Sequence, residues 1–156
     1  MGGNMASLRN YRRFYALLKA AKVEASEKSS LARVYSEGRT ESLRELTDKE
    51  WKELIRHLEG SAKAMVERDV RDRKRKKVIA IFAAMGYTYK YNHGTSNIEA
   101  PDMAAIYKTI QQKGCHKPKH LNDYSSEELS DLIYQFEKIK DFYNEKQKIN
   151  DIVSSL

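Results

Sequence analysis

Residues 47–59 read TDKEWKELIRHLE, and residues 125–137 read SSEELSDLIYQFE. Each stretch opens with a capping box. The hydroxyl of Thr47 or Ser125 accepts a hydrogen bond from the amide three residues later, and the carboxylate of Glu50 or Glu128 reaches back to the cap amide. Apolar residues follow at helical spacing, namely Trp51, Leu54, Ile55 and Leu58 in the first stretch and Leu129, Leu132, Ile133 and Phe136 in the second. We therefore expect two amphipathic helices that begin alike.

The likeness between the two halves of the chain continues upstream of these helices. Leu31, Val34 and Gly38 correspond to Tyr107, Ile110 and Gly114, and residues 14–23 correspond loosely to residues 78–87. Self-similarity of this kind indicates a structural unit that occurs twice. We predict an all-α fold of two pseudo-repeated three-helix units that share a core, with one compact domain as the alternative to two. We assign a disordered start to residues 1–7, the first repeat to 8–60 and the second repeat to 61–156.

Glycines mark the predicted ends of the helices. Gly38 suits a left-handed cap after a short helix at 26–37, in which Leu31, Val34 and Tyr35 face inward. Gly60 is predicted to end the helix that starts at Thr47, and Gly86 to end a helix over residues 62–85. The second half of that helix is apolar on nearly all sides, so we expect it to be buried between the repeats.

The region after Gly86 carries the one β signal in the sequence. Tyrosines alternate ahead of an Asn-His-Gly-Thr turn within residues 87–98, which predicts a short β-hairpin. Pro101 is predicted to start the next helix, which Gly114 caps. The final helix is predicted to run from the capping box at Ser125 to about residue 149.

Composition limits the class of protein. The chain has 156 residues, 40% of them hydrophobic, which is enough to bury a core. Its one cysteine, Cys115, cannot form an internal disulfide, and no apolar stretch suits a signal peptide or a membrane span. We expect a cytoplasmic protein with no membrane partner.

Catalytic and metal-binding patterns are weak. Cys115, His116, His120 and His93 have suitable donor atoms but lack the paired spacing of a zinc site. Neither a phosphate-binding glycine loop nor a pair of catalytic acids stands out. We predict no enzyme activity, no catalytic residues, no metal and no cofactor.

The formal net charge of +7 is concentrated in one segment. Residues 61–90 carry nine basic and three acidic side chains, and residues 68–77 alone carry seven basic ones. Such a run can follow a phosphate backbone, and its other interpretation is a solvated helix half in which Asp69 and Asp72 form local salt bridges. The candidate nucleic-acid-binding residues are Arg68, Arg71, Arg73, Lys74, Arg75, Lys76 and Lys77, with Arg12 and Arg13 extending the surface.

Two other surfaces are candidates for binding. Tyr87, Tyr89 and Tyr91 suit stacking on bases or on a protein partner, and the alternative is that they cover the core while their hydroxyls reach water. Residues 26–59 also suggest a helix-turn-helix, although the connector over residues 39–46 is longer than usual and the last helix carries carboxylates.

In the order of its segments, the chain resembles the GemA family of phage Mu-type regulatory proteins. The resemblance rests on the basic and apolar helix over residues 11–23, the short helix with Arg33 and the helix start at residues 46–48. It continues through residues 73–83 and the closing stretch at residues 121–137. It implies an all-helical phage or prophage protein that modulates gene expression inside a bacterial host. The tyrosine-rich segment at residues 87–98 departs from the family pattern.

The leading hypothesis is therefore a phage-type regulatory protein that binds nucleic acid through its basic helix. DNA is the preferred candidate, and RNA is the other. The alternative is a non-enzymatic adaptor that binds a host transcription or DNA-topology factor through the tyrosine segment and the final helix. A homodimer is a further hypothesis, because Ile139, Phe142, Tyr143 and Ile149 form an apolar stripe on the final helix.

Overall fold

The computed structural model describes residues 9–93 and 96–154. These residues are mostly helical and include one two-stranded antiparallel sheet, which confirms the helical class and the short hairpin. The predicted disordered start at residues 1–7 lies outside the described residues. The chain divides into two compact units at Arg68 and Asp69. We call the described residues up to Arg68 the first unit and those from Asp69 the second unit.

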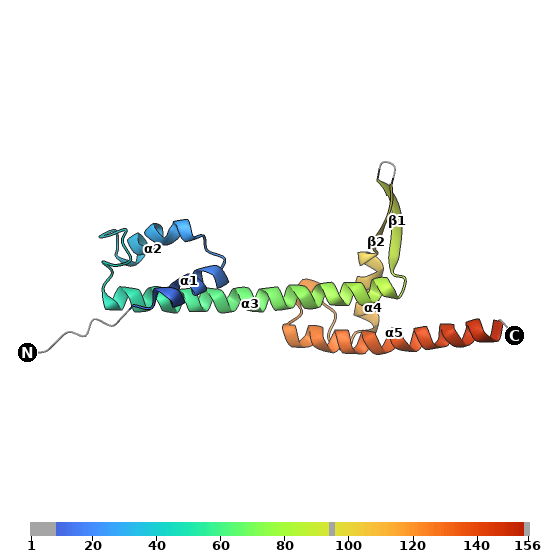
Figure 1. Ribbon diagram of the computed structural model, residues 1–156. Coiled ribbons are helices and arrows are strands. Elements are labelled where there is room, and N and C mark those ends of the chain that lie inside the picture. Colours follow the sequence, from blue (N-terminus) through green and yellow to red (C-terminus); the bar gives the residue numbers. More distant parts are fainter. Residues whose placement is uncertain (1–8, 94–95, 155–156) are drawn as a thin grey trace, which may run out of the picture. The chain divides into compact units, whose positions relative to one another are not determined.

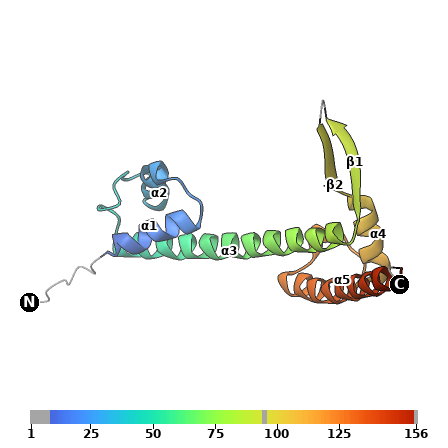
Figure 2. The ribbon, with the colours of Figure 1, turned by 45° about the vertical axis from the view of Figure 1, so that its right-hand side comes forward.

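The first unit contains α1 (Tyr11–Ala20), the 3-10 helix η1 (Ala25–Glu27), α2 (Lys28–Tyr35) and the first part of α3 (Asp48–Ala84). The side chain of Asn10 caps α1 by accepting a hydrogen bond from the amide of Arg13 at 2.9 Å. Figures 1 and 2 show α1 and α2 beside the first part of α3. The apolar faces of the three helices meet in a core of Phe14, Leu18, Ala32, Leu43, Leu46, Trp51, Leu54 and Leu58.

The predicted end of a helix at Gly60 is wrong, because α3 continues without a break from Asp48 to Ala84. A single interior glycine costs about 1 kcal/mol relative to alanine, which packing on both sides of it readily offsets. The inward position of Val34 is also wrong, since its side chain is 69% exposed. Leu31 and Tyr35 do pack against the core as predicted, beside the buried Ala32 and the buried cap residue Ser36. Gly38 has a φ of +86°, which confirms its left-handed conformation.

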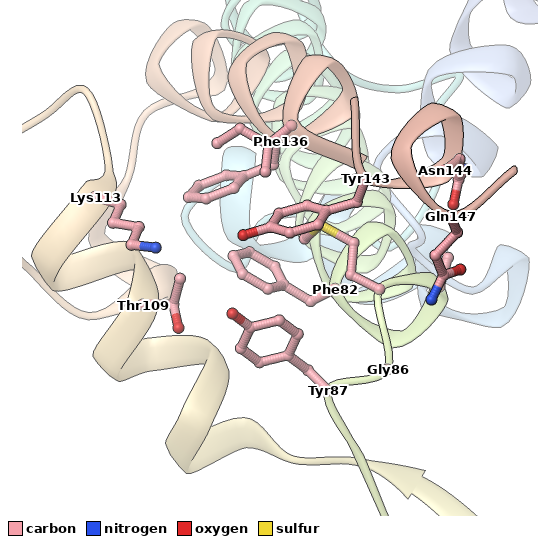
Figure 3. Close-up of a pocket in the computed structure, with 12 residues that line it drawn as sticks. Phe82, Gly86, Tyr87, Thr109, Lys113, Phe136, Tyr143, Asn144 and Gln147 are labelled. Carbon is pink, nitrogen blue, oxygen red and sulfur yellow. The ribbon is translucent and has the colours of Figure 1, made fainter. Parts of the chain in front are cut away.

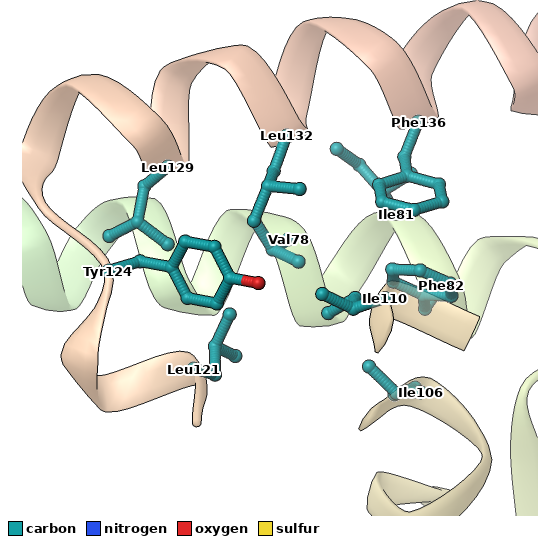
Figure 4. Close-up of a cluster of buried hydrophobic side chains, with 10 residues drawn as sticks. All are labelled: Val78, Ile81, Phe82, Ile106, Ile110, Leu121, Tyr124, Leu129, Leu132 and Phe136. Carbon is teal, nitrogen blue, oxygen red and sulfur yellow. The ribbon is translucent and has the colours of Figure 1, made fainter. Parts of the chain in front are cut away.

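The second unit contains the rest of α3, β1 (Thr88–His93), β2 (Ser96–Pro101), α4 (Met103–Lys113), the 3-10 helix η2 (Leu121–Asp123) and α5 (Ser126–Ser154). Gly86 ends α3 as predicted, with a φ of +88°. Its core gathers side chains from α3, α4, η2 and α5 (Figure 4). The core residues are Val78, Ile81, Phe82, Ile106, Ile110, Leu121, Tyr124, Leu129, Leu132 and Phe136. The apolar half of the basic helix is thus buried in the core of this unit, which corrects the prediction that it lies between the two repeats.

The hairpin is longer than the sequence indicated. Its strands pair Thr88 with Pro101 at the base and Tyr91 with Ile98. Pro101 therefore ends β2, and α4 is capped instead by Asp102, whose carboxylate accepts a hydrogen bond from the amide of Ala105 at 3.0 Å. Gly114 follows α4 with a φ of −67°, so this cap is not left-handed.

Both predicted capping boxes are present. The amide of Glu50 donates to the hydroxyl of Thr47 at 3.3 Å, and the amide of Thr47 donates to the Glu50 carboxylate at 2.6 Å. In the second unit the same two hydrogen bonds join Ser125 and Glu128, at 3.2 and 2.7 Å. A cation adds to each box, because Arg39 binds Glu50 and Lys119 binds Glu128, both at 2.7 Å. In the described residues, no helix is long and apolar enough to cross a membrane.

Candidate nucleic-acid interface

The predicted basic run lies on α3, where helical periodicity distributes its cations around the helix. Arg73 and Lys76 are exposed. The Nε atom of Arg73 donates to the backbone carbonyl of Asp69 at 3.4 Å. We call Arg73 and Lys76 the second-unit basic surface. They are available to an external anion.

Lys74 points into the second unit. Its ammonium donates to the carbonyl of Ser126 at 2.8 Å and to the hydroxyls of Ser126 and Ser130 at 2.8 and 2.7 Å. An ammonium group has three donors, so these contacts use all of them. Lys74 therefore holds the first turn of α5 and has no donor left for a phosphate.

Arg75 and Lys77 are also engaged within the second unit. Arg75 binds the side-chain oxygen of Asn122 and the carboxylate of Asp72, both at 2.9 Å. Lys77 pairs with Glu137 at 2.8 Å, and the hydrogen bond from its ammonium lowers the pKa of Glu137. Arg71 is half-buried. The basic run therefore offers fewer free cations than its sequence suggested.

The cations predicted in the first unit also differ from one another. Arg12 is exposed, and Arg68 is exposed on α3 at the end of this unit. Arg13 pairs with the carboxylate of Glu59. Arg9 is largely enclosed, since its guanidinium donates to the carbonyls of Leu43, Arg44 and Leu46 just before α3. Arg9 thus fixes the loop, and Arg12 faces solvent.

The structure brings together a basic groove that the sequence interpretation missed. A hollow of about 400 Å³ lies between the start of α1 and α3. Its lining comprises Arg9, Asn10, Arg13, Trp51, Lys52, Ile55, Arg56 and Glu59, so four cations accompany one carboxylate. We call these residues the first-unit basic groove. The spacing of Lys52 and Arg56, four residues apart and away from the apolar stripe, was the signal that could have identified it.

The electrostatics of these surfaces suit a polyanion better than a single buried ligand. The groove is shallow, and Lys52 and Arg56 are exposed to water. Exposed cations of this kind bind phosphates mainly by releasing condensed counterions, which gives affinity without sequence preference. Trp51 is buried against Phe14 and Tyr11, so it is a core residue and is not a base-stacking platform.

The three candidate tyrosines separate into two environments. The rings of Tyr89 and Tyr91 lie 5.7 Å apart on an exposed face of β1. Tyr87 precedes the strand and packs edge-on against the ring of Phe82, with 5.1 Å between their centroids. Tyr89 and Tyr91 are thus accessible to a partner, whereas Tyr87 belongs to the edge of the core.

The other candidate sites gain little from the structure. In the part of the chain that is described, no three His, Cys, Asp or Glu side chains are placed to hold a metal ion. His116 lies 3.0 Å from the carboxylate of Asp131 at the surface, and Cys115 is exposed. In the proposed helix-turn-helix, residues 36–47 separate α2 from α3, a connector longer than that motif uses.

No family model, no curated protein and no solved structure matches the chain. The resemblance to the GemA family therefore stays a hypothesis that rests on the sequence pattern alone.

Proposed function

We propose that this chain is a phage-type regulatory protein that binds the backbone of nucleic acid through exposed cations on both units. One observation carries the proposal: Arg73 and Lys76 face solvent on α3 while the neighbouring Lys74 and Arg75 are used inside the unit. Arginine and lysine on the outer side of a helix position a protein on phosphates without specifying bases. Regulation of gene expression is the role that the resemblance suggests for such binding.

The two units support the proposal in similar ways, and we infer that they are pseudo-repeats of one three-helix unit. An offset of 64 residues relates Arg12 to Lys76, both exposed, and Arg13 to Lys77. Arg13 pairs with Glu59, and Lys77 pairs with Glu137. Each unit then presents a free cation next to an ion-paired one on its first helical segment. Two such surfaces on one chain increase the avidity for a long polyanion.

The test compares pairs of substitutions that each remove two positive charges. Arg73→Gln with Lys76→Gln alters the second-unit basic surface, and Lys52→Gln with Arg56→Gln alters the first-unit basic groove. Lys146→Gln with Lys148→Gln, on α5 between the carboxylates of Glu145 and Asp151, is the matched control. Fluorescence anisotropy with a labelled random duplex at low salt measures each dissociation constant.

We expect each basic-surface pair to weaken binding by about tenfold and the control pair by less than about threefold. Circular dichroism spectra verify that each variant is folded. Equal weakening by all three pairs would indicate a response to net charge alone and would contradict the assignment of these surfaces. Unchanged binding in both basic-surface pairs would also contradict it.

A second candidate function is a protein-interaction adaptor, and the exposed apolar side chains favour it. Tyr89 is 51% exposed, Phe142 is 64% exposed and Ile149 is 60% exposed. Tyr89→Ser with Tyr91→Ser would abolish capture of a host protein and leave duplex binding intact. The basic-surface pairs would have the opposite effect, so the two functions are separable in one set of variants.

The homodimer hypothesis has the same kind of support. Phe142, Ile149 and Val153 recur at intervals of seven and four residues on the exposed part of α5. Such a stripe suits a helical seam between two copies. Light scattering over a concentration series would show a mass that rises to that of a dimer, and a constant monomer mass would exclude the seam.

A further inference from the structure

The second unit contains a pocket that neither the sequence interpretation nor the proposed function uses. It has a volume of about 500 Å³ and lies where the end of α3 meets α4 and α5 (Figure 3). This volume falls in the range of pockets that hold small organic molecules. The pocket lies away from Arg73 and Lys76, which do not line it.

Aromatic rings form one side of the pocket. Phe82 and Phe136 are fully buried, and their ring centroids lie 4.5 Å apart. Tyr87 packs edge-on against Phe82, and the ring of Tyr143 extends the aromatic wall on the α5 side. Because Phe82 and Phe136 are fully buried, the half-buried Tyr87 and the exposed Tyr143 present the ring surfaces on which a planar ligand would stack.

Polar atoms converge on the other side of the pocket. Figure 3 shows the ammonium of Lys113 and the hydroxyls of Tyr87 and Tyr143 turned toward the same space. Among the described residues, these three groups form no hydrogen bond or ion pair with the protein. Thr109 stands beside them, with its hydroxyl donating to the carbonyl of Ala105 at 2.9 Å. The groups are therefore available as donors to a ligand.

The charge of the lining residues indicates the sign of the charge on a ligand that would bind in the pocket. Among the described residues that line the pocket, Lys113 is the one charged side chain and none is a carboxylate. An ammonium flanked by phenolic donors favours a carboxylate or a phosphate, because charge-assisted hydrogen bonds are stronger than neutral ones. The amides of Asn144 and Gln147 at the rim supply further neutral donors and acceptors.

We propose that this pocket binds a small planar aromatic anion, with its ring against Tyr87 and Tyr143 and its anionic group at Lys113. The anion has two chemical sources, a nucleotide and an aryl carboxylate, which share the ring and the negative charge. The inference goes beyond the proposed function and does not depend on it, because the basic surfaces take no part in the pocket.

The experiment titrates the full chain with adenosine monophosphate and, separately, with 2-naphthoate while amide shifts are followed by NMR. Adenosine, which has the ring without the negative charge, and inorganic phosphate, which has the negative charge without the ring, are titrated as controls. Two variants alter the pocket, Lys113→Met and Tyr143→Ala, both at exposed positions where folding is not at risk. Their matched controls are Lys117→Met and Tyr134→Ala, exposed residues that do not line the pocket.

We expect at least one aromatic anion to shift the amides of Gly86, Thr109 and Asn144 saturably, and the responding probe identifies its source. Lys113→Met and Tyr143→Ala would each weaken that binding by about tenfold, a difference equal to about 1.4 kcal/mol. The control variants would change it by less than about twofold. Adenosine and phosphate would each bind at least about tenfold more weakly than the complete anion.

Several results would overturn the proposal. No saturable shift with either aromatic anion at millimolar concentration would exclude the site. Binding that survives Lys113→Met and Tyr143→Ala but is lost with Arg73→Gln and Lys76→Gln would place the anion on the second-unit basic surface. That result would leave the proposed function intact. If the pocket binds the anion but the chain does not bind duplex, the pocket proposal holds and the proposed function fails.

Discussion

The two units use the same local devices but use their cations differently. A capping box that a cation reinforces starts α3 in the first unit and α5 in the second unit. Apolar residues of the other helices in each unit pack against that helix. In the first unit, Lys52 and Arg56 lie exposed beside a shallow hollow, while Arg9 is held by loop carbonyls. In the second unit, Lys74 and Arg75 reach across to α5 and η2. Long basic side chains thus serve as packing and hydrogen-bonding groups as well as surface charges.

The largest predicted effect tests whether the units fold independently. Phe14 and Phe82 are each fully buried, one in each core. Replacement of a buried phenylalanine by alanine destabilises a domain by about 3–5 kcal/mol. Hydrogen exchange should show lost protection in α1 and α2 for Phe14→Ala and in α4 and α5 for Phe82→Ala. Equal loss in all four helices for either variant would show one cooperative domain.

The next prediction contrasts an enclosed cation with an exposed one. Lys74→Ala removes three hydrogen bonds and leaves the carbonyl of Ser126 with one partner fewer, so we expect a loss of about 1–2 kcal/mol. Lys76→Ala should change stability by less than about 0.5 kcal/mol, because its side chain is exposed. Chemical denaturation measures both values. Equal effects would refute the distinction between the two lysines.

The caps provide a comparison at smaller scale. Thr47→Ala and Ser125→Ala each remove a side-chain acceptor from a helix start, and each should cost about 1 kcal/mol. Thermal denaturation of the two variants gives the values. A cap that matters in one unit but not in the other would mark a real difference between their last helices.

The same caps predict a dependence of stability on pH. The backbone hydrogen bond from Thr47 lowers the pKa of Glu50, and the hydrogen bond from Lys119 lowers the pKa of Glu128. A lowered folded-state pKa stabilises the fold above the unfolded pKa, and this contribution is lost as the pH falls through the folded value. Carboxyl NMR titrations should show both glutamates titrating below ordinary exposed glutamates. Glu50→Gln and Glu128→Gln should each reduce the acid sensitivity of stability.

The smallest predicted effect concerns the two matching ion pairs. Glu59→Gln releases Arg13 and Glu137→Gln releases Lys77, so each should allow one more phosphate contact. The slope of log affinity against log salt should then steepen by about 0.9 for each variant on duplex DNA. If only one variant steepens the slope, nucleic acid contacts only that unit.

Local signals predicted most of the fold, and long-range contacts explain what they missed. The capping boxes, the apolar stripes and the turn at Gly86 depend on residues close together in sequence, so they could be predicted. The continuous helix through Gly60 could not, because its stability comes from packing on residues far away along the chain. On α2, Leu31 and Tyr35 pack inward as predicted, but Val34 was misplaced because the small Ala32 takes the buried position.

The candidate site shows the same division. The sequence identified Arg12, Arg73 and Lys76 as candidate binding residues, and all three are exposed in the structure. That Lys74 and Arg75 turn inward could not be predicted, because their partners lie on η2 and α5, about 50 residues away. The groove around Lys52 and Arg56 also depends on where α1 lies against α3.

A salt series of nucleic-acid binding tests the central claim most directly. The wild-type chain would be titrated against a random duplex, a single strand and a folded RNA from low to near-physiological salt. We predict micromolar or tighter binding at low salt that weakens steeply as salt rises, with a shallower slope for the Arg73→Gln and Lys76→Gln pair. Absence of binding at low salt, or affinity that does not respond to salt, would contradict a phosphate-binding function.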